Sequence, residues 1–134
     1  MRERKNNCTS TVIFKTIFFI CALYFFIMGA ALISFPHLII RGVSENNVNP
    51  TIIGMLRGAG GSIIPYSLLY ILIALNPFKR MWALIIIFIA NVTAIVLDIG
   101  SVIIGEYKSS YTMYDIPIEI LSIIGIIIIW KIAK

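Results

Sequence analysis

Residues 81–105 read MWALIIIFIANVTAIVLDIGSVIIG, an apolar stretch whose single ionisable side chain is Asp98. A helix of ~20 residues crosses the ~30 Å hydrocarbon core of a bilayer, and this stretch is long enough to do so. Three similar stretches lie at about 16–35, 51–75 and 116–133. They are continuous rather than alternating, and in lipid the backbone must satisfy its own hydrogen bonds. The sequence therefore predicts an all-α, polytopic membrane protein, with four transmembrane helices forming an antiparallel bundle in one domain over residues 1–134.

The composition argues against a water-soluble fold. Of the 134 residues, 60% are hydrophobic and 13% are charged, and the mean hydropathy is +0.99. A soluble domain is about one quarter charged. The first apolar stretch follows a basic leader, as in a secretory signal peptide, and Ala30-Ala31 could serve as its cleavage site. That stretch is longer than the ~7–15 residues of a signal core, so we expect a retained first helix.

The basic residues indicate how the chain is oriented. Many lie in the leader, the 76–80 turn and the C-terminus, and few lie in the 36–50 and 106–115 connections. Because cytoplasmic segments carry the excess of Lys and Arg, we expect a multi-pass protein of the cell membrane with both termini cytoplasmic. Residues 35–40 are too short to span, and we expect them to form an interfacial turn. The basic residues on the expected cytoplasmic side are Arg2, Arg4, Lys5, Lys15, Lys79, Arg80, Lys131 and Lys134. Those in the two outer connections are Arg41 and Lys108.

Signals for catalysis or for a cofactor are missing from the sequence. Cys8 lies in the leader and Cys21 in an apolar stretch, so we expect no disulfide or redox pair. A single histidine argues against a zinc site. Residues 58–61, Gly-Ala-Gly-Gly, lack the Lys-Ser/Thr that completes a phosphate loop. We predict no catalytic residues, no metal site and no cofactor, and since the cations are dispersed, no binding of nucleic acid.

Two charged residues within the predicted spans are the main candidate site. Arg57 lies six residues after Thr51, and Asp98 lies seven residues before Gly105. At 1.5 Å per residue, both sit roughly 9–10 Å below the outer boundary. Charged groups in a span usually pair or mark a functional site. We predict an Arg57–Asp98 ion pair, which could be a structural contact between helices or could bind an anionic ligand or relay a proton.

Small residues follow the same face of the second predicted helix as Arg57. Gly54, Gly58 and Gly61 recur at spacings of three to four residues. Such a pattern permits close approach of helix backbones in a membrane. We therefore predict that these glycines pack against a neighbouring helix.

Three further polar residues could contribute to a site. Glu119 lies one turn into the fourth predicted helix, and His37 lies in the first outer connection. Together with Asn91 they could line an outer vestibule. Each also has a simpler explanation: Glu119 would favour a helix N-terminus, His37 would be an interfacial side chain, and Asn91, the deepest, would make an interhelical hydrogen bond.

Several positions together resemble the DoxX-like group of small four-helix bacterial membrane proteins. They are Pro36 after the first helix, the stretch Arg57-Gly58-Ala59-Gly60-Gly61, Arg80 before the third helix, and Asp98. The resemblance implies the four-helix layout and a role for Arg57. Some members are linked to respiratory or thiol redox systems, but this chain has no paired cysteines.

Three functions remain open from the sequence. The first is a non-enzymatic accessory subunit that binds a membrane-protein partner or forms a homo-oligomer. The second is a small-solute or proton-coupled transporter. The third is a membrane enzyme acting on a lipid or quinone, against which stands the absence of a nucleophile–base set. With any of these three functions, we expect the protein to be embedded in the lipid bilayer.

Overall fold

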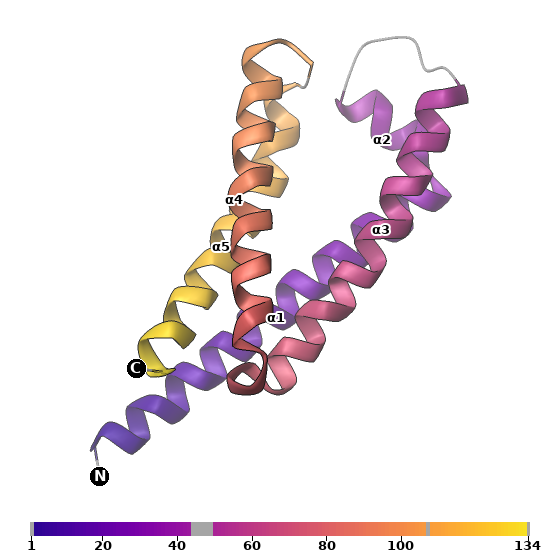
Figure 1. The fold of residues 1–134 in the computed structure, drawn as a ribbon. Coiled ribbons are helices and arrows are strands. Elements are labelled where there is room, and N and C mark those ends of the chain that lie inside the picture. Colours follow the sequence, from indigo (N-terminus) through magenta and orange to yellow (C-terminus); the bar gives the residue numbers. More distant parts are fainter. Residues whose placement is uncertain (1, 44–49, 107, 134) are drawn as a thin grey trace.

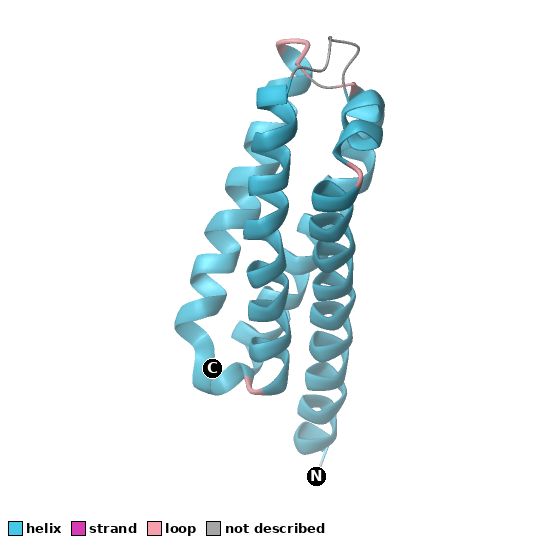
Figure 2. Ribbon diagram, turned by 90° about the vertical axis from the view of Figure 1, so that its right-hand side faces the viewer, coloured by secondary structure: helices cyan, strands magenta, loops and turns pink. Residues whose placement is uncertain are grey.

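The computed structural model describes residues 2–43, 50–106 and 108–133, which are helical except at short connections (Figures 1 and 2). No strand occurs in these residues, which confirms the all-α prediction. The elements are α1 (Arg2–Ser34), α2 (Pro36–Val43), α3 (Pro50–Leu75), the 3-10 helix η1 (Pro77–Arg80), α4 (Met81–Ile103) and α5 (Ser109–Ala133).

The structure confirms four helices with the length and apolar composition that a membrane crossing requires. They cover Thr9–Ser34, Thr51–Leu75, Pro77–Ile103 and Asp115–Ala133. Each carries large apolar side chains on its outer surface, such as Leu23, Leu68, Val96 and Ile124. In water an apolar surface of this extent would be unfavourable, whereas in a bilayer it faces a matching solvent.

Several helix boundaries differ from the sequence-based expectation. The expected interfacial turn is instead the short helix α2, which begins at Pro36, where the fixed φ of proline suits a first helical position. The helix α5 begins at Ser109, several residues before the predicted span. By contrast, α4 ends close to the expected place. Gly105 has φ +79°, and the Glu106 amide donates to the Ser101 carbonyl at 2.8 Å, which is a glycine-terminated helix end.

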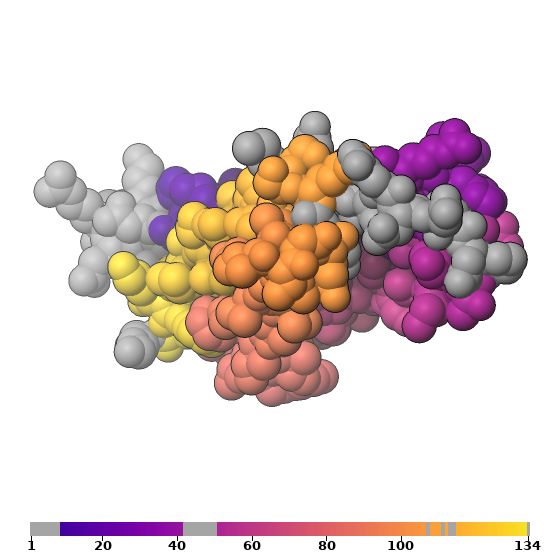
Figure 3. Space-filling view, turned by 90° about the horizontal axis from the view of Figure 1, so that it is seen from above, coloured from indigo at the N-terminus to yellow at the C-terminus, as the bar shows by residue number. Residues whose placement is uncertain are grey.

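The helix α1 is central to the packing. It contacts α3 most extensively and then α5, while α4 packs against α5. The two termini lie at one end of the bundle, which we call the η1 end, and α2 and the α4–α5 connection lie at the other, the α2 end (Figure 1). Although η1 joins α3 to α4, these two helices diverge toward the α2 end (Figure 1). Seen from that end, α3 and α5 lie on opposite sides (Figure 3).

Close backbone approach occurs between α1 and α3, at Gly29 and Gly60. A Cβ on Gly60 would lie 2.6 Å from the Gly29 carbonyl oxygen, and a Cβ on Gly29 would lie 3.0 Å from the Gly60 carbonyl oxygen. The sequence had instead predicted helix packing at Gly54, Gly58 and Gly61. Within the single chain this prediction is wrong, because a Cβ on any of these three glycines would have no neighbour within 4 Å.

An aromatic cluster fills the interior near the middle of α1 and α3. The rings of Phe18 and Phe25 lie 5.0 and 5.4 Å from that of Tyr70, which is fully buried. The Tyr66 ring meets the Tyr70 ring edge-on at 5.2 Å. These contacts hold the Tyr66 and Tyr70 hydroxyls inside the bundle, next to α4 and α5.

Candidate intramembrane polar site

The first polar group in the interior consists of Tyr70, Asn91 and Ser122, which we call the hydroxyl–amide cluster. The Asn91 Nδ2 donates to the Tyr70 hydroxyl at 2.8 Å and to the Ser122 hydroxyl at 3.2 Å. The Tyr70 and Ser122 oxygens are 2.8 Å apart and share a hydrogen bond. These bonds join α3, α4 and α5, which confirms the interhelical role expected of Asn91.

The second group consists of Asp98 on α4 and of Asp115 and Glu119 on α5, which we call the carboxylate cluster. Glu119 interacts electrostatically with both aspartates, and Asp98 also interacts with Asp115. All three charges have the same sign, so each disfavours ionisation of the others. The Tyr24 hydroxyl of α1 donates a hydrogen bond to Oδ1 of Asp115. Three helices therefore converge on one acidic region.

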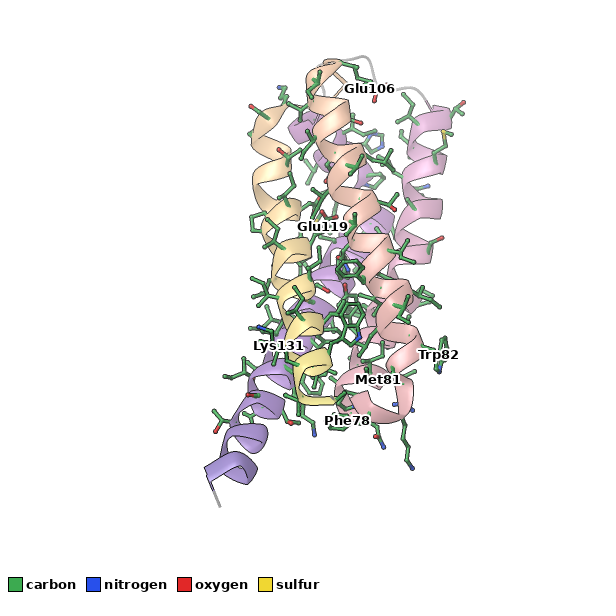
Figure 4. All side chains as sticks on the ribbon, turned by 60° about the vertical axis from the view of Figure 1, so that its left-hand side comes forward. Phe78, Met81, Trp82, Glu106, Glu119 and Lys131 are labelled. Atoms are coloured by element: carbon green, nitrogen blue, oxygen red, sulfur yellow. The ribbon has the colours of Figure 1, made fainter. Side chains whose placement is uncertain are left out.

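Glu119 is the most enclosed member of the carboxylate cluster. Its side chain is 6% exposed, and its Oε2 atom has no hydrogen-bond partner among the described residues. Figure 4 shows it in the interior between α4 and α5, while Glu106 lies at the α2 end and Lys131 near the η1 end. The explanation that Glu119 lies in the first turn of its helix is wrong, because α5 begins ten residues earlier, at Ser109. A buried carboxylate oxygen without a partner is costly, and the binding of a proton or another ligand would relieve that cost.

Tyr66 lies near both clusters. It interacts electrostatically with Glu119, and it lies next to Tyr70 and Asn91. Hydroxyl groups both donate and accept hydrogen bonds, so they can extend a polar path. Polar groups thus continue from Tyr24 and Asp115 near the α2 end to Ser122 in the middle of α5. Beyond them, toward the η1 end, the interior is closed by buried apolar residues that include Phe14, Leu84, Ile126 and Ile129.

The structure does not bring Arg57 to Asp98. Arg57 is exposed on α3, Asp98 is half-buried on α4, and within the described residues no ion pair joins them. The divergence of α3 and α4 explains this, because equal depth in the membrane does not make two helices neighbours (Figure 1). His37 is exposed on α2. Of the residues predicted for an outer vestibule, the interior holds Glu119 and Asn91.

Sequence reasoning missed Asp115, Tyr24, Tyr66, Tyr70 and Ser122. Asp115 was assigned to a connection, although it lies four residues before Glu119, a spacing that places two side chains on one helix face. Tyr66 and Tyr70 have the same spacing on α3. These intervals were readable signals, whereas the contribution of Tyr24 depends on how α1 packs and has no counterpart in local sequence.

The ionisable side chains of the described interior are carboxylates, tyrosine hydroxyls and one thiol. Within the part of the chain that the structure describes, no group of three or more His, Cys, Asp or Glu side chains is arranged to hold a metal ion. Cys21 is buried and unpaired by any disulfide. Its thiol lies 3.8 Å from the Ile118 carbonyl oxygen. The ionisable chemistry of the interior therefore rests on the three carboxylates and the tyrosine hydroxyls.

Comparison with known proteins adds no family. No protein-family model matches this chain, and neither curated proteins nor solved structures include a similar one. The resemblance to the DoxX-like group consequently stays a prediction. The function must be argued from the intramembrane site itself.

Proposed function

We propose that this chain is a small transporter of the cell membrane that takes up a proton, or a small monovalent cation in its place, at Glu119. The observation that carries the proposal is the buried Glu119 carboxylate, whose Oε2 has no partner among the described residues. Its charged neighbours are two further carboxylates. A proton would remove the charge and supply a donor to this acidic region, which is the function such intramembrane acids commonly serve.

The polar path supports movement as well as binding. Tyr66 lies near both clusters, so polar groups extend from the α2 end to Ser122 in the middle of α5. The apolar interior at the η1 end would keep this path closed on that side. Polar groups toward one end of the bundle and a closed apolar interior toward the other give the asymmetry that alternating access requires. Proton coupling to a small solute is therefore the second part of the proposal.

The proton-bearing carboxyl can be tested without knowing the solute. N,N′-dicyclohexylcarbodiimide dissolves in membranes and reacts with protonated carboxyl groups. We expect the purified protein in detergent to gain an adduct on Glu119, detected by mass spectrometry of peptides. Labelling should slow as the pH rises, because the ionised carboxylate does not react. If added Na⁺ slows labelling at constant pH, the cation competes with the proton.

The matched control is Glu106, an exposed carboxylate in the α4–α5 connection. Glu119→Gln should abolish the adduct, whereas Glu106→Gln should leave it unchanged. If Glu119 remains unlabelled at acidic and at alkaline pH, the proposal fails. Labelling that does not depend on Glu119 would also contradict it.

The proposed orientation places both termini in the cytoplasm and the α2 end outside. Its support is the excess of Lys and Arg at the η1 end, and the location of both termini at that end (Figure 1). A reporter fused after Lys134 should be active on the cytoplasmic side, and one inserted after Glu106 on the other side. A Lys134 fusion that reports the exterior would contradict the orientation.

A second candidate function is that of an accessory subunit bound to another membrane protein. The observation that favours it is Arg57, an exposed arginine within the span Thr51–Leu75. A guanidinium facing lipid is costly, and contact with an acidic partner helix would relieve that cost. Purification in a mild detergent would then recover a second protein in fixed proportion, and Arg57→Ala would release it.

A further inference from the structure

The exposed face of α3 carries an arginine surrounded by glycines that have no packing partner within the chain. Arg57 lies on it between Gly54 and Gly61, and a Cβ on any of its three glycines would meet nothing within 4 Å. Glycine at these positions is therefore not required by packing within the chain. It would permit a helix from outside to approach closely, with Arg57 at the contact.

The complementary charge lies on the same molecule. Asp98 on α4 is half-buried and, within the described residues, forms no ion pair with Arg57. Counted along their helices, Arg57 is six residues after Thr51 and Asp98 is five residues before Ile103, both at the α2 end. At 1.5 Å per residue, the two side chains are at similar depth, about 7.5–9 Å from that end.

We propose that two copies of this chain associate in the membrane so that Arg57 of each copy pairs with Asp98 of the other. A two-fold axis along the membrane normal keeps depth unchanged, so Arg57 of one copy and Asp98 of the other lie at the same level, and any contact between them forms twice. The pairing would remove Arg57 from lipid and place a positive charge beside the carboxylate cluster of the second copy. In a single chain the carboxylate cluster lacks this positive charge, which the second copy would supply.

This inference rests on the proposed function, because Asp98 would pair with Arg57 of the second copy while Glu119 would remain free to bind the proton. It also explains why three carboxylates can lie together inside a membrane. One is engaged by Arg57 of the second copy, and Asp115 accepts the hydrogen bond from Tyr24. Glu119 is then the one whose oxygen remains without a partner.

The decisive experiment uses two full-length variants that carry different affinity tags in the same cells. Arg57→Asp places two carboxylates at the pair, and Asp98→Arg places two guanidinium groups there. Neither variant can pair with itself, but each can pair with the other through two attractive contacts. Since a close charge pair changes affinity by about tenfold or more, the mixed pair should co-purify about tenfold better than either variant with itself.

A pair formed within one chain would show no such rescue, which would overturn the inference. If Arg57 instead holds the phosphate of a lipid headgroup, Arg57→Asp would not co-purify with itself or with Asp98→Arg. Asp98→Arg would co-purify with itself as well as the wild type does, and the inference would be overturned. Recovery of a different membrane protein in place of the second copy would also overturn it. Arg41→Asp, which changes an exposed arginine of α2, is the matched control and should not be rescued by Asp98→Arg.

A second variant avoids any change of charge in the membrane. Gly58→Leu should leave the fold of one chain intact, because its side chain enters open space, but it should prevent close approach of the second copy. Wild-type protein crosslinked in membranes should run as a dimer, and Gly58→Leu should reduce that dimer about tenfold. Gly100→Leu is the control, since Gly100 is equally open and lies on the opposite side of α4 from Asp98.

Carbodiimide labelling of the same samples separates this inference from the proposed function. A wild-type protein that is monomeric but labelled at Glu119 would overturn the dimer and leave the proton site in place. A dimer without labelling at Glu119 would retain the dimer and overturn the proton site.

Discussion

The hydroxyl–amide cluster and the carboxylate cluster lie in the same bundle, and both link α4 to α5, yet they differ in how their polar atoms are satisfied. Asn91, Tyr70 and Ser122 are neutral and hydrogen-bond to one another, all within 3.2 Å. The carboxylate cluster contains charges of one sign and a buried oxygen without a partner among the described residues. A satisfied neutral network stabilises a helix interface, whereas an unsatisfied acidic one is costly until it gains a proton or another partner.

The largest expected effect on stability lies in the first cluster, at Tyr70. Its side chain is fully buried and contacts the rings of Phe18, Phe25 and Tyr66. Tyr70→Ala should lower the free energy of unfolding by about 3–5 kcal/mol, as removal of a buried aromatic ring usually does. Titration of the detergent-solubilised protein with a denaturing detergent would measure it. Leu68→Ala, on the exposed side of α3, is the control, and an equal loss there would contradict the assignment.

Glu119 should show the opposite behaviour, with a large effect on function and little on stability. In liposomes containing a pH-sensitive dye and given a membrane potential, Glu119→Gln should slow proton entry about tenfold, which corresponds to about 1.4 kcal/mol. Its stability should equal or exceed that of the wild type, since an unpaired buried charge is removed. Glu106→Gln should resemble the wild type in both measurements. A wild-type rate no faster than that of protein-free liposomes would contradict proton movement.

The smallest effect is expected from Asn91, whose amide bonds to groups that also bond to each other. Asn91→Ala should lower the free energy of unfolding by about 0.6–1.7 kcal/mol, the range found for hydrogen bonds between transmembrane helices. Carbodiimide labelling of Glu119 should not change. Combining it with Tyr70→Phe gives a double-mutant cycle, and strictly additive losses would show that the two side chains do not interact.

The four spans could be predicted from sequence because each depends on a local property, a long run of apolar side chains. The same is true of the end of α4, where Gly105 supplies the positive φ. The prediction was wrong where it depended on which helices are neighbours. It assumed that α3 and α4, consecutive in the chain, pack along their length, whereas α1 lies between α3 and α5 in the order of contacts.

That difference also explains the candidate site. Arg57 and Asp98 were paired from their equal depth and from the small residues beside them, and neither feature carries information on lateral position. Glu119 and Asn91 were found because any polar residue within a span is conspicuous. Tyr24 and Tyr66 were not, because a tyrosine near a span is ordinary, and only the packing of α1 brings the Tyr24 hydroxyl to Asp115. For the glycines, sequence identified the pattern but could not distinguish Gly60, which contacts α1, from Gly58.

The central position of α1 bears on how the protein is made. A chain emerges from the ribosome beginning at its N-terminus. The α1–α3 contact at Gly29 and Gly60 therefore becomes available before α4 and α5 have been synthesised. Asp98 follows later on α4, and Asp115 and Glu119 belong to α5. The carboxylate cluster can therefore form only after α5 has been synthesised, later than the α1–α3 contact.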